Sequence, residues 1–418
     1  MHNRVLLRNT IPVLMETARE VHSVCIGIWV KVGARNESAE KNGISHFLEH
    51  MFFKGTARRT AQDIAAEVDT LGAELNAYTS SEYTLYYIKV LDEFMEQGLD
   101  LLTDIVMHSL FPEEDIEKEK NIVHEEIKMI EDNPADYVYE LFGKNIWGCA
   151  GLGQPVLGTT DTISSFTRRD LIGHIERFYG AENIIVACSG NFSEQLLLDH
   201  LNRTLGELEK RGGLGQQAPS LFSGKVDVIT KDLSESHICL GLEGLPYSSE
   251  ERYAMHLLNT VLGSGISSRL FQNIREKRGL VYSIYSYHAA YVDTGLWAVY
   301  AGTDRRHLCD VLNITMDEIK GLPETITEEE LRRSKSQLKG NLILALESTS
   351  NKMTNIAKQE IYYGKYYSPA EIIEMVDSVS LGQVKQLARR LVDRNPFALT
   401  VYGPVKEQDL RDSCRLLQ

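Results

Sequence analysis

Several features that mark whole classes of protein are missing from this chain of 418 residues. Its six cysteines are scattered and include no Cys-x-x-Cys pair. That argues against a disulfide scaffold and against a thiolate zinc site, and it favours free thiols in a reducing compartment. No run of about 18 apolar residues occurs, so no membrane span is expected. Because the N-terminus also lacks the apolar core of a secretory signal, we expect a cytoplasmic protein.

Positive charge is in deficit, with 44 Lys and Arg against 59 Asp and Glu and a formal net charge of −15. Nucleic acid is therefore not an expected partner, because binding phosphates needs a basic surface. The Gly-rich segment 147–160 is not followed by Gly-Lys-Ser/Thr, so it does not match a P-loop. The chain is too long for one ordinary core, which predicts two or three domains of a soluble globular protein.

The most informative stretch runs from Ile44 to Thr56 and contains His46-Phe47-Leu48-Glu49-His50. His46 and His50 are four residues apart, so on a helix they project from the same face and could hold one metal ion. Glu49 precedes the second His and would lie within reach of a water molecule on that metal. The order His-x-x-Glu-His is the inverse of the commoner zinc-peptidase motif. The alternative is a helix that carries two His and a Glu by chance. The apolar residues recur at the spacing of a buried helix face: Ile44, Phe47, Leu48 and Met51.

A second candidate feature lies on a helix expected at about 113–131. Glu119 and Glu126 are seven residues apart and share nearly one face with the apolar Ile122 and Val123. Carboxylates on an apolar face need a partner, because burying an unpaired charge is costly. A metal ion would be a sufficient partner, whereas an acidic surface helix is the simpler alternative.

The second half of the chain repeats the pattern of the first half without its metal set. The segment 256–260, His-Leu-Leu-Asn-Thr, keeps the first His of the motif and loses its Glu and second His. The counterparts of the two downstream glutamates are roughly Ser334 and Asn341. We therefore predict an internal duplication. Its parts are a metal-bearing domain at 1–210, a Gly-rich linker at 211–224 and a homologous domain at 225–418.

Four separate stretches together resemble the pitrilysin and mitochondrial-processing-peptidase family of zinc metallopeptidases, the inverzincins. The pattern is closest to the bacterial processing-protease branch. The four stretches are Gly43 to Thr56, Glu126 with Glu119 before it, Asn76-Ala77-Tyr78-Thr79-Ser80, and Arg275 to Tyr282. The resemblance covers essentially the whole chain, and the combination is more specific than the metal motif alone.

The resemblance implies an α/β fold of the α+β type. It has two duplicated domains, each a mostly antiparallel sheet with packed helices, which face each other across a clam-like cavity. Chains of this length in the family usually pair, so a homodimer is expected.

The resemblance also assigns roles to individual residues. One Zn²⁺ per chain, for which Co²⁺ or Mn²⁺ could substitute, would be held by His46, His50 and Glu126. Glu49 would take the proton of the attacking water and pass it to the leaving amine, and Glu119 would tune the site from behind the ligands. Tyr282, alone or together with Arg275, would stabilise the developing oxyanion or hold the peptide carbonyl. The substrate would pair with an edge strand that includes Asn76, Ala77 and Tyr78.

These residues predict a zinc endopeptidase for extended, unstructured peptides or leader segments. The peptide substrate is the expected partner, with no nucleic acid and no membrane. A catalytically silent scaffold or partner subunit is one alternative, and the complete set of motif residues argues against it. A processing subunit that is active only with a second, different chain is the other alternative, and it stays open.

Overall fold

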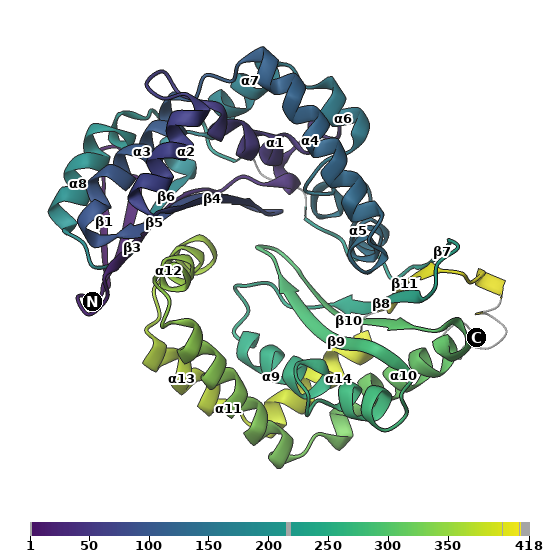
Figure 1. Ribbon diagram of the computed structural model, residues 1–418. Helices are drawn as coiled ribbons and strands as arrows, with labels where there is room; N and C mark the ends of the chain where they lie inside the picture. The colour runs from purple at the N-terminus through teal and green to yellow at the C-terminus, as the bar shows by residue number, and fades with distance from the viewer. Residues whose placement is uncertain (1, 215–218, 395, 409, 411–418) are drawn as a thin grey trace. The chain divides into compact units, whose positions relative to one another are not determined.

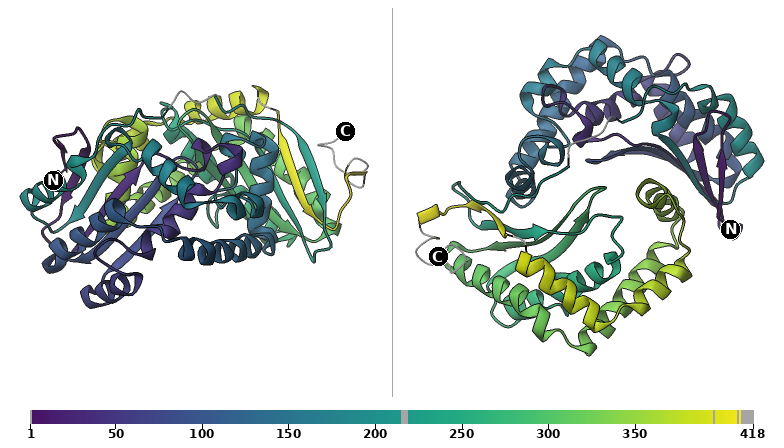
Figure 2. Two further views of the ribbon diagram at one scale, coloured as in Figure 1. Left: turned by 90° about the horizontal axis from the view of Figure 1, so that it is seen from above. Right: turned by 180° about the vertical axis from the view of Figure 1, so that it is seen from behind.

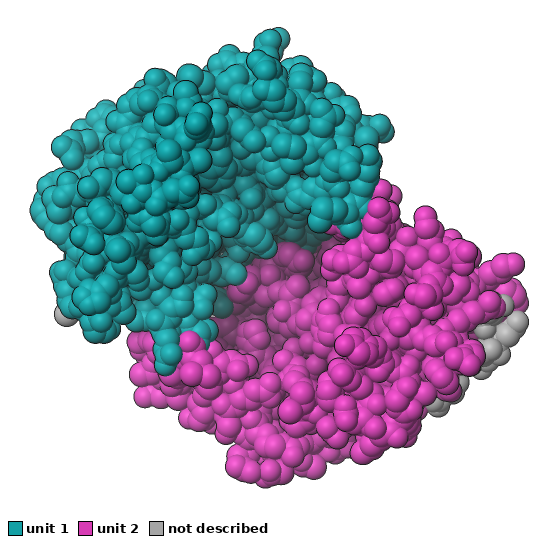
Figure 3. Space-filling view, viewed as in Figure 1, with its two compact units in different colours: residues 1–129, 149–218, 345–366 teal, residues 130–148, 219–344, 367–418 magenta. Residues whose placement is uncertain are grey.

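The structure is a computed structural model that describes residues 2–214, 219–394, 396–408 and 410. It is a mixed α/β protein with two sheets (Figure 1), as the sequence predicts. The chain forms two compact units. Unit 1 comprises residues 1–129, 149–218 and 345–366, and unit 2 comprises residues 130–148, 219–344 and 367–418 (Figure 3).

Unit 1 contains a six-stranded sheet in the order β1-β2-β6-β3-β5-β4. All neighbouring strands are antiparallel except the parallel pair β2 and β6. Strand β3 is central and almost entirely buried, whereas β4 pairs with β5 alone and forms an edge. The strands are β1 (His2–Leu6), β2 (Pro12–Thr17), β3 (Ser23–Val30), β4 (Glu74–Thr79), β5 (Thr84–Leu91) and β6 (Ile184–Gly190).

Unit 2 contains a five-stranded sheet in the order β7-β11-β8-β10-β9. Strands β7 and β11 are parallel, and the other neighbours are antiparallel. This order repeats that of β2 to β6, strand for strand, and among the described residues β1 has no counterpart. The strands are β7 (Val226–Thr230), β8 (Ser236–Glu243), β9 (Val281–Ala290), β10 (Gly295–Thr303) and β11 (Ala398–Gly403). The shared topology confirms the predicted pair of similar, mostly antiparallel domains.

Helices cover one face of each sheet (Figures 1 and 2). Their buried apolar side chains form the core of each unit together with those of the strands. In unit 1 these helices are α1 (Ile44–Met51), α2 (Ala61–Leu71), α3 (Met95–His108), α4 (Glu113–Glu131), α6 (Thr160–Ser165), α7 (Arg168–Phe178) and α8 (Glu194–Arg203). In unit 2 they are α9 (Arg252–Gly263), α10 (Leu308–Thr325), α11 (Glu328–Ala345), α13 (Pro369–Ser378) and α14 (Leu381–Arg394). Over the described part of the chain, none of the helices combines the length and the apolar character that crossing a membrane requires.

The opposite face of each sheet is covered by a helix from the other half of the sequence. Helix α12 (Thr349–Tyr363) lies on the sheet of unit 1, where Met353, Ile356 and Ala357 are buried and Trp29 Nε1 donates to Met353 Sδ at 3.4 Å. Helix α5 (Pro134–Trp147) lies in the same way on the sheet of unit 2 through Val138, Phe142 and Ile146. The contiguous ranges 1–210 and 225–418 therefore do not describe the compact units, because each sheet needs a helix from outside its own range.

The expected linker at 211–224 begins as part of unit 1. The backbone N–H groups of Arg211 and Gly213 donate to Glu182 Oε1 at 2.8 and 2.6 Å. Residues 215–218 of this stretch lie outside the described residues. The start of the linker is thus fixed by a carboxylate.

The cysteines agree with the sequence prediction at four positions. Cys25, Cys149, Cys188 and Cys239 are free thiols. Cys309 is disulfide-bonded, so the expectation of free thiols is wrong there. Cys414 lies outside the described residues.

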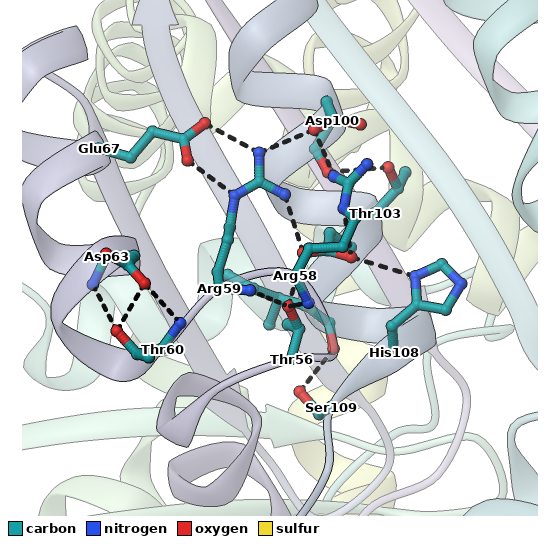
Figure 4. Close-up of polar contacts among 12 residues, drawn as sticks. Thr56, Arg58, Arg59, Thr60, Asp63, Glu67, Asp100, Thr103, His108 and Ser109 are labelled. Carbon is teal, nitrogen blue, oxygen red and sulfur yellow. Dashed lines mark hydrogen bonds and ion pairs between the residues drawn. The ribbon is translucent and has the colours of Figure 1, made fainter.

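The segment that leaves the helical stretch of the motif is held by a network of charges (Figure 4). Asp104 of α3 is 2% exposed and accepts hydrogen bonds from Thr56 Oγ1 and Arg59 Nη1, both at 2.8 Å. Arg59 also donates to Glu67 of α2 at 2.7 and 3.0 Å and to Asp100 at 2.8 Å. Burial raises the pKa of Asp104, but the hydrogen bonds from Arg59 and Thr56 outweigh burial and hold that pKa below its ordinary value.

We predict that Asp104→Asn destabilises the protein by roughly 3 kcal/mol, the lower end for removing one partner of a buried ion pair. The variant leaves Arg59 with one fewer counter-charge in a site that is largely closed to water. Urea unfolding at neutral pH measures the loss. Glu114→Gln is the matched control, because its exposed pair with Lys118 should contribute no more than about 0.5 kcal/mol.

The lowered pKa of Asp104 also gives this prediction a pH dependence. A carboxylate whose pKa is depressed by folding stabilises the folded state above its unfolded pKa of about 3.9, and the contribution is lost as the pH falls through the folded pKa. The difference in unfolding free energy between wild type and Asp104→Asn should therefore become smaller below about pH 4. A difference that is constant with pH would show that Asp104 acts through packing.

Candidate metal centre

Helix α1 carries the first two candidate ligands and is held by its apolar face. Ile44, Phe47, Leu48 and Met51 are buried in the core of unit 1, as their spacing predicts. His46 and His50 project from the other side, with ring centroids 4.7 Å apart. His46 is 7% exposed, and burial, followed by the neighbouring His50, lowers its pKa to about 3. The His46 ring is therefore neutral at ordinary pH and has a lone pair for a cation.

Helix α4 brings the third candidate ligand to the same point. Glu126 Oε2 lies 3.7 Å from His46 Nε2 and 3.6 Å from His50 Nε2. One ligand atom from each of the three side chains falls within 4.8 Å of the others. Among the described residues, these three form the one group of His, Cys, Asp or Glu side chains that lies close enough together to hold a metal ion. Two imidazoles and one carboxylate are a ligand set of catalytic zinc sites, so the residues fit the predicted ion.

Glu119, predicted to act from behind the ligands, contacts one of them directly. Its Oε1 lies 2.8 Å from His50 Nδ1, and its Oε2 lies 2.5 Å from Lys54 Nζ. The carboxylate is 3% exposed; burial raises its pKa, but the hydrogen bonds from His50 and Lys54 lower it on balance. A carboxylate at Nδ1 favours the proton on that nitrogen and leaves Nε2 for the metal. Sequence reasoning missed Lys54, although it lies four residues after His50 and thus one turn further along.

Glu49 lies next to this group and is held by the edge strand. Thr79, the last residue of β4, donates its Oγ1 hydroxyl to Glu49 Oε2 at 2.5 Å. Burial raises the pKa of the Glu49 carboxyl, and the hydrogen bond from Thr79 opposes that rise. Sequence reasoning placed Thr79 on the edge strand but did not foresee its bond to Glu49, because a contact over thirty positions leaves no periodic signal.

Strand β4 is the sheet edge predicted for substrate pairing. Leu75 and Ala77 pack against the core of unit 1, while Asn76 and Tyr78 point to the other face, where Tyr78 is 55% exposed. The outer side of an edge strand has backbone N–H and C=O groups without strand partners. An extended peptide could pair with them.

The N-terminus of α1 is fixed by a carboxylate that the sequence analysis did not single out. The side chain of Glu37 is buried and accepts from the backbone N–H of Gly43 at 2.7 Å and of Ser45 at 2.8 Å. Gly43 has φ 92°, and a Cβ there would lie 2.6 Å from the Leu157 carbonyl of the Gly-rich segment 147–160. That segment therefore serves close packing on α1.

Arg275 and Tyr282 lie in unit 2, on consecutive elements. Arg275 belongs to the π-helical turn η8 (Phe271–Glu276), and its guanidinium lies 5.4 Å from the ring centroid of Tyr282 on β9. Tyr282 is 81% exposed, so its hydroxyl is available to a ligand. The structure brings these two residues together, and their role in the reaction stays a prediction.

Two family models match the chain. Residues 12–160 match the model described as Insulinase (Peptidase family M16). Residues 165–338 match the model described as Peptidase M16 inactive domain. The first match contains all three candidate metal ligands.

Curated relatives match the chain over nearly its full length. An uncharacterized zinc protease of Bacillus subtilis, YmxG, is 41% identical over 406 residues, covering 97% of this chain and 98% of its own. An uncharacterized zinc protease of Streptomyces coelicolor is 38% identical over 417 residues, covering 96% and 90%. Both names support zinc as the metal and a hydrolase as the class of enzyme.

Solved structures share the fold. A peptidase M16 inactive domain from Pseudomonas fluorescens has a TM-score of 0.90 at 20% identity and covers 97% of this chain and 98% of its own. A protease from Helicobacter pylori has a TM-score of 0.87 at 22% identity and covers 97% and 99%. A chain of complex III2 from Candida albicans has a TM-score of 0.84 at 21% identity and covers 98% and 99%. With its relatives 38 to 41% identical over almost their entire length, this chain belongs to the M16 family of peptidases.

Proposed function

We propose that the chain is a zinc endopeptidase that cleaves extended, unstructured peptides or leader segments. The observation that carries the proposal is the convergence of His46, His50 and Glu126 beside Glu49, which is itself bonded to the edge strand β4. When bound by the three ligands, zinc would supply a Lewis acid that polarises the peptide carbonyl and lowers the pKa of water.

In this proposal the protein side chains move the proton. Glu49 accepts a proton from the attacking water and returns it to the nitrogen of the leaving amine. The Thr79 hydroxyl occupies Glu49 Oε2 and thereby orients the carboxylate, which leaves Oε1 to accept the proton. Burial, which raises the pKa of Glu49, brings its basicity closer to the neutral range in which a general base works best.

The substrate class follows from the exposed edge of β4. We infer that Asn76, Ala77 and Tyr78 bind the peptide through main-chain hydrogen bonds. A peptide already paired within a folded protein has no free backbone for this purpose. Unstructured segments are therefore the expected substrates.

We also propose that two identical chains form a homodimer, which light scattering on the purified protein can test.

A catalytically silent partner subunit is the competing proposal. A chain related in fold occurs in complex III2, but at 21% identity that likeness concerns the fold alone. A silent subunit does not require two converging histidines, a third converging glutamate and a carboxylate oriented by Thr79. Peptide hydrolysis by the purified chain, with and without chelator, separates the two proposals.

The metal proposal predicts that purified wild type binds one zinc ion per chain and that His50→Ala does not. The variant removes one of three ligands. Elemental analysis after dialysis measures the difference. The matched control is His124→Ala, because this half-buried His on α4 is hydrogen-bonded to the Thr160 carbonyl and should leave the metal in place. Equal metal content in wild type and His50→Ala would overturn the assignment.

Glu49→Gln should keep the metal and lower kcat by at least about a hundredfold. Glutamine fills the same volume and can still meet Thr79, but it cannot accept the proton. Cleavage of an unstructured peptide, with metal content measured on the same sample, tests this. Glu125→Gln, whose exposed side chain pairs with Lys128, should cleave at the normal rate. Near-normal cleavage by metal-loaded Glu49→Gln would remove Glu49 from the mechanism.

The predicted role of Tyr282 calls for a kinetic test. Tyr282→Phe removes one exposed hydroxyl and should leave folding and metal content unchanged. If the hydroxyl stabilises an oxyanion, kcat should fall by about 10²-fold or more. Tyr285→Phe on the same strand is the control, because the Tyr285 hydroxyl is already bonded to that of Tyr139. A kcat loss shared equally by both variants would argue for a structural effect.

A further inference from the structure

Lys358 lies on α12, the helix from the second half of the sequence that covers the sheet of unit 1. Its half-buried ammonium group is close to aromatic rings. Its Nζ lies 5.7 Å from the ring centroid of Tyr83, whose ring is 4.9 Å from that of Trp29. Among the residues that the structure describes, no Asp or Glu pairs with it, and burial lowers the pKa of its ammonium group. Lys352 on the same helix does have an acidic partner, Glu16, at 3.9 Å.

A partly buried charge without a counter-charge destabilises the folded protein, because the lost hydration is not replaced. The cation–π contact with Tyr83 offsets part of this cost, since such contacts contribute about 0.5 to 2 kcal/mol. The chain has 59 acidic residues from which a partner could have come. The setting of Lys358 therefore points to an anion supplied from outside the chain.

The ammonium lies on the same face of the sheet as the exposed residues of the edge strand. Tyr78 on β4 is paired in register with Leu85 on β5. Cross-strand partners point to the same face, and Leu85 belongs to the cluster that α12 covers. The Tyr78 and Tyr83 rings are 6.2 Å apart, so the side chains of Lys358, Tyr83 and Tyr78 form a row from α12 to the free edge.

This row reaches β4 at the end that contacts the predicted base. Thr79, the residue after Tyr78, holds Glu49. A peptide that pairs with the outer edge of β4 places alternate side chains on the two faces of the sheet. Every second side chain near Glu49 would then project toward Tyr78, Tyr83 and Lys358.

We propose that Lys358 binds a carboxylate of the peptide substrate close to the bond that is cleaved. The carboxylate belongs either to an acidic side chain or to the C-terminus of the peptide. The two tyrosine rings pack against the aliphatic part of the bound residue, and the ammonium donates to its carboxylate. The inference rests on the proposed peptidase function and makes it specific. Helix α12, from the second half of the sequence, thereby selects substrates in unit 1.

The test uses a series of unstructured peptides that differ at one residue. Glu is compared with Gln at each of three positions on either side of the cleaved bond, and each peptide is made with a free and an amidated C-terminus. In wild type, kcat/KM should favour Glu by about tenfold at a position on the α12 face and show no preference at the two adjacent positions. Tenfold is a modest value for a hydrogen bond to a charged group. A preference for the free C-terminus instead would identify the terminal carboxylate as the source.

Three variants of the full-length chain assign the preference to its source. Lys358→Met keeps the length of the side chain and should abolish the preference, while the Gln peptide is cleaved within about twofold of the wild-type rate. Lys358→Arg keeps the charge and should retain the preference. Lys352→Met is the matched control on the same helix and should behave as wild type.

Binding provides a second readout that does not require catalysis. The dissociation constants of fluorescent Glu and Gln peptides for the Glu49→Gln chain should differ by about the same factor, and Lys358→Met in that background should equalise them. Failure of wild type to cleave any peptide would contradict the proposed function, and the binding ratios would still decide the role of Lys358. Equal losses for both peptides in Lys358→Met, or an unchanged ratio, would overturn the inference and leave Lys358 a structural residue.

Discussion

The candidate metal centre depends on the fixed position of one short helix, α1, in the fold of unit 1. Helix α1 has eight residues and is held at both ends by buried carboxylates. At the start of α1, Glu37 accepts hydrogen bonds from the backbone N–H groups of Gly43 and Ser45. Near the end of α1, Glu119 is hydrogen-bonded to His50 Nδ1. Because two imidazoles and a carboxylate must meet within a few tenths of an ångström to hold zinc, such restraints matter more here than overall stability.

The residues around the ligands connect the chemistry to the strand that would receive substrate. The Thr79 hydroxyl holds the predicted base from the last position of β4. The turn that follows β4 is in its place because the backbone N–H groups of Ala34 and Arg35 donate to the carbonyls of Ser80 and Ser81. Strand, base and metal helix therefore form one continuous set of hydrogen bonds in unit 1. A peptide seated on β4 would be aligned with Glu49 by the fold itself.

The exchange of helices ties the two halves of the chain together. Each sheet has two apolar faces, and each half of the sequence supplies helices for one face of its own sheet and one helix for the other sheet. Without α12, the face of Trp29 and Leu85 would be open to water, so the half that carries the candidate metal ligands is incomplete by itself. The same helix brings Lys358 to the side of β4, which gives the second half a direct part in substrate choice.

The sequence by itself determined the elements with strong local signals. The apolar spacing of α1, the seven-residue spacing of Glu119 and Glu126 and the edge strand before Ser80 can all be read from neighbouring residues. Periodicity reports which face of one element is buried, and the duplication reports that two sheets share one topology. Tertiary structure decided the rest. The remaining contacts join distant segments of the chain. They are those of Thr79 with Glu49, of Lys54 with Glu119, of Glu37 with the N-terminus of α1, and of α12 with the sheet of unit 1. Burial and packing select such partners only when the chain is folded, so no local pattern of residues encodes them.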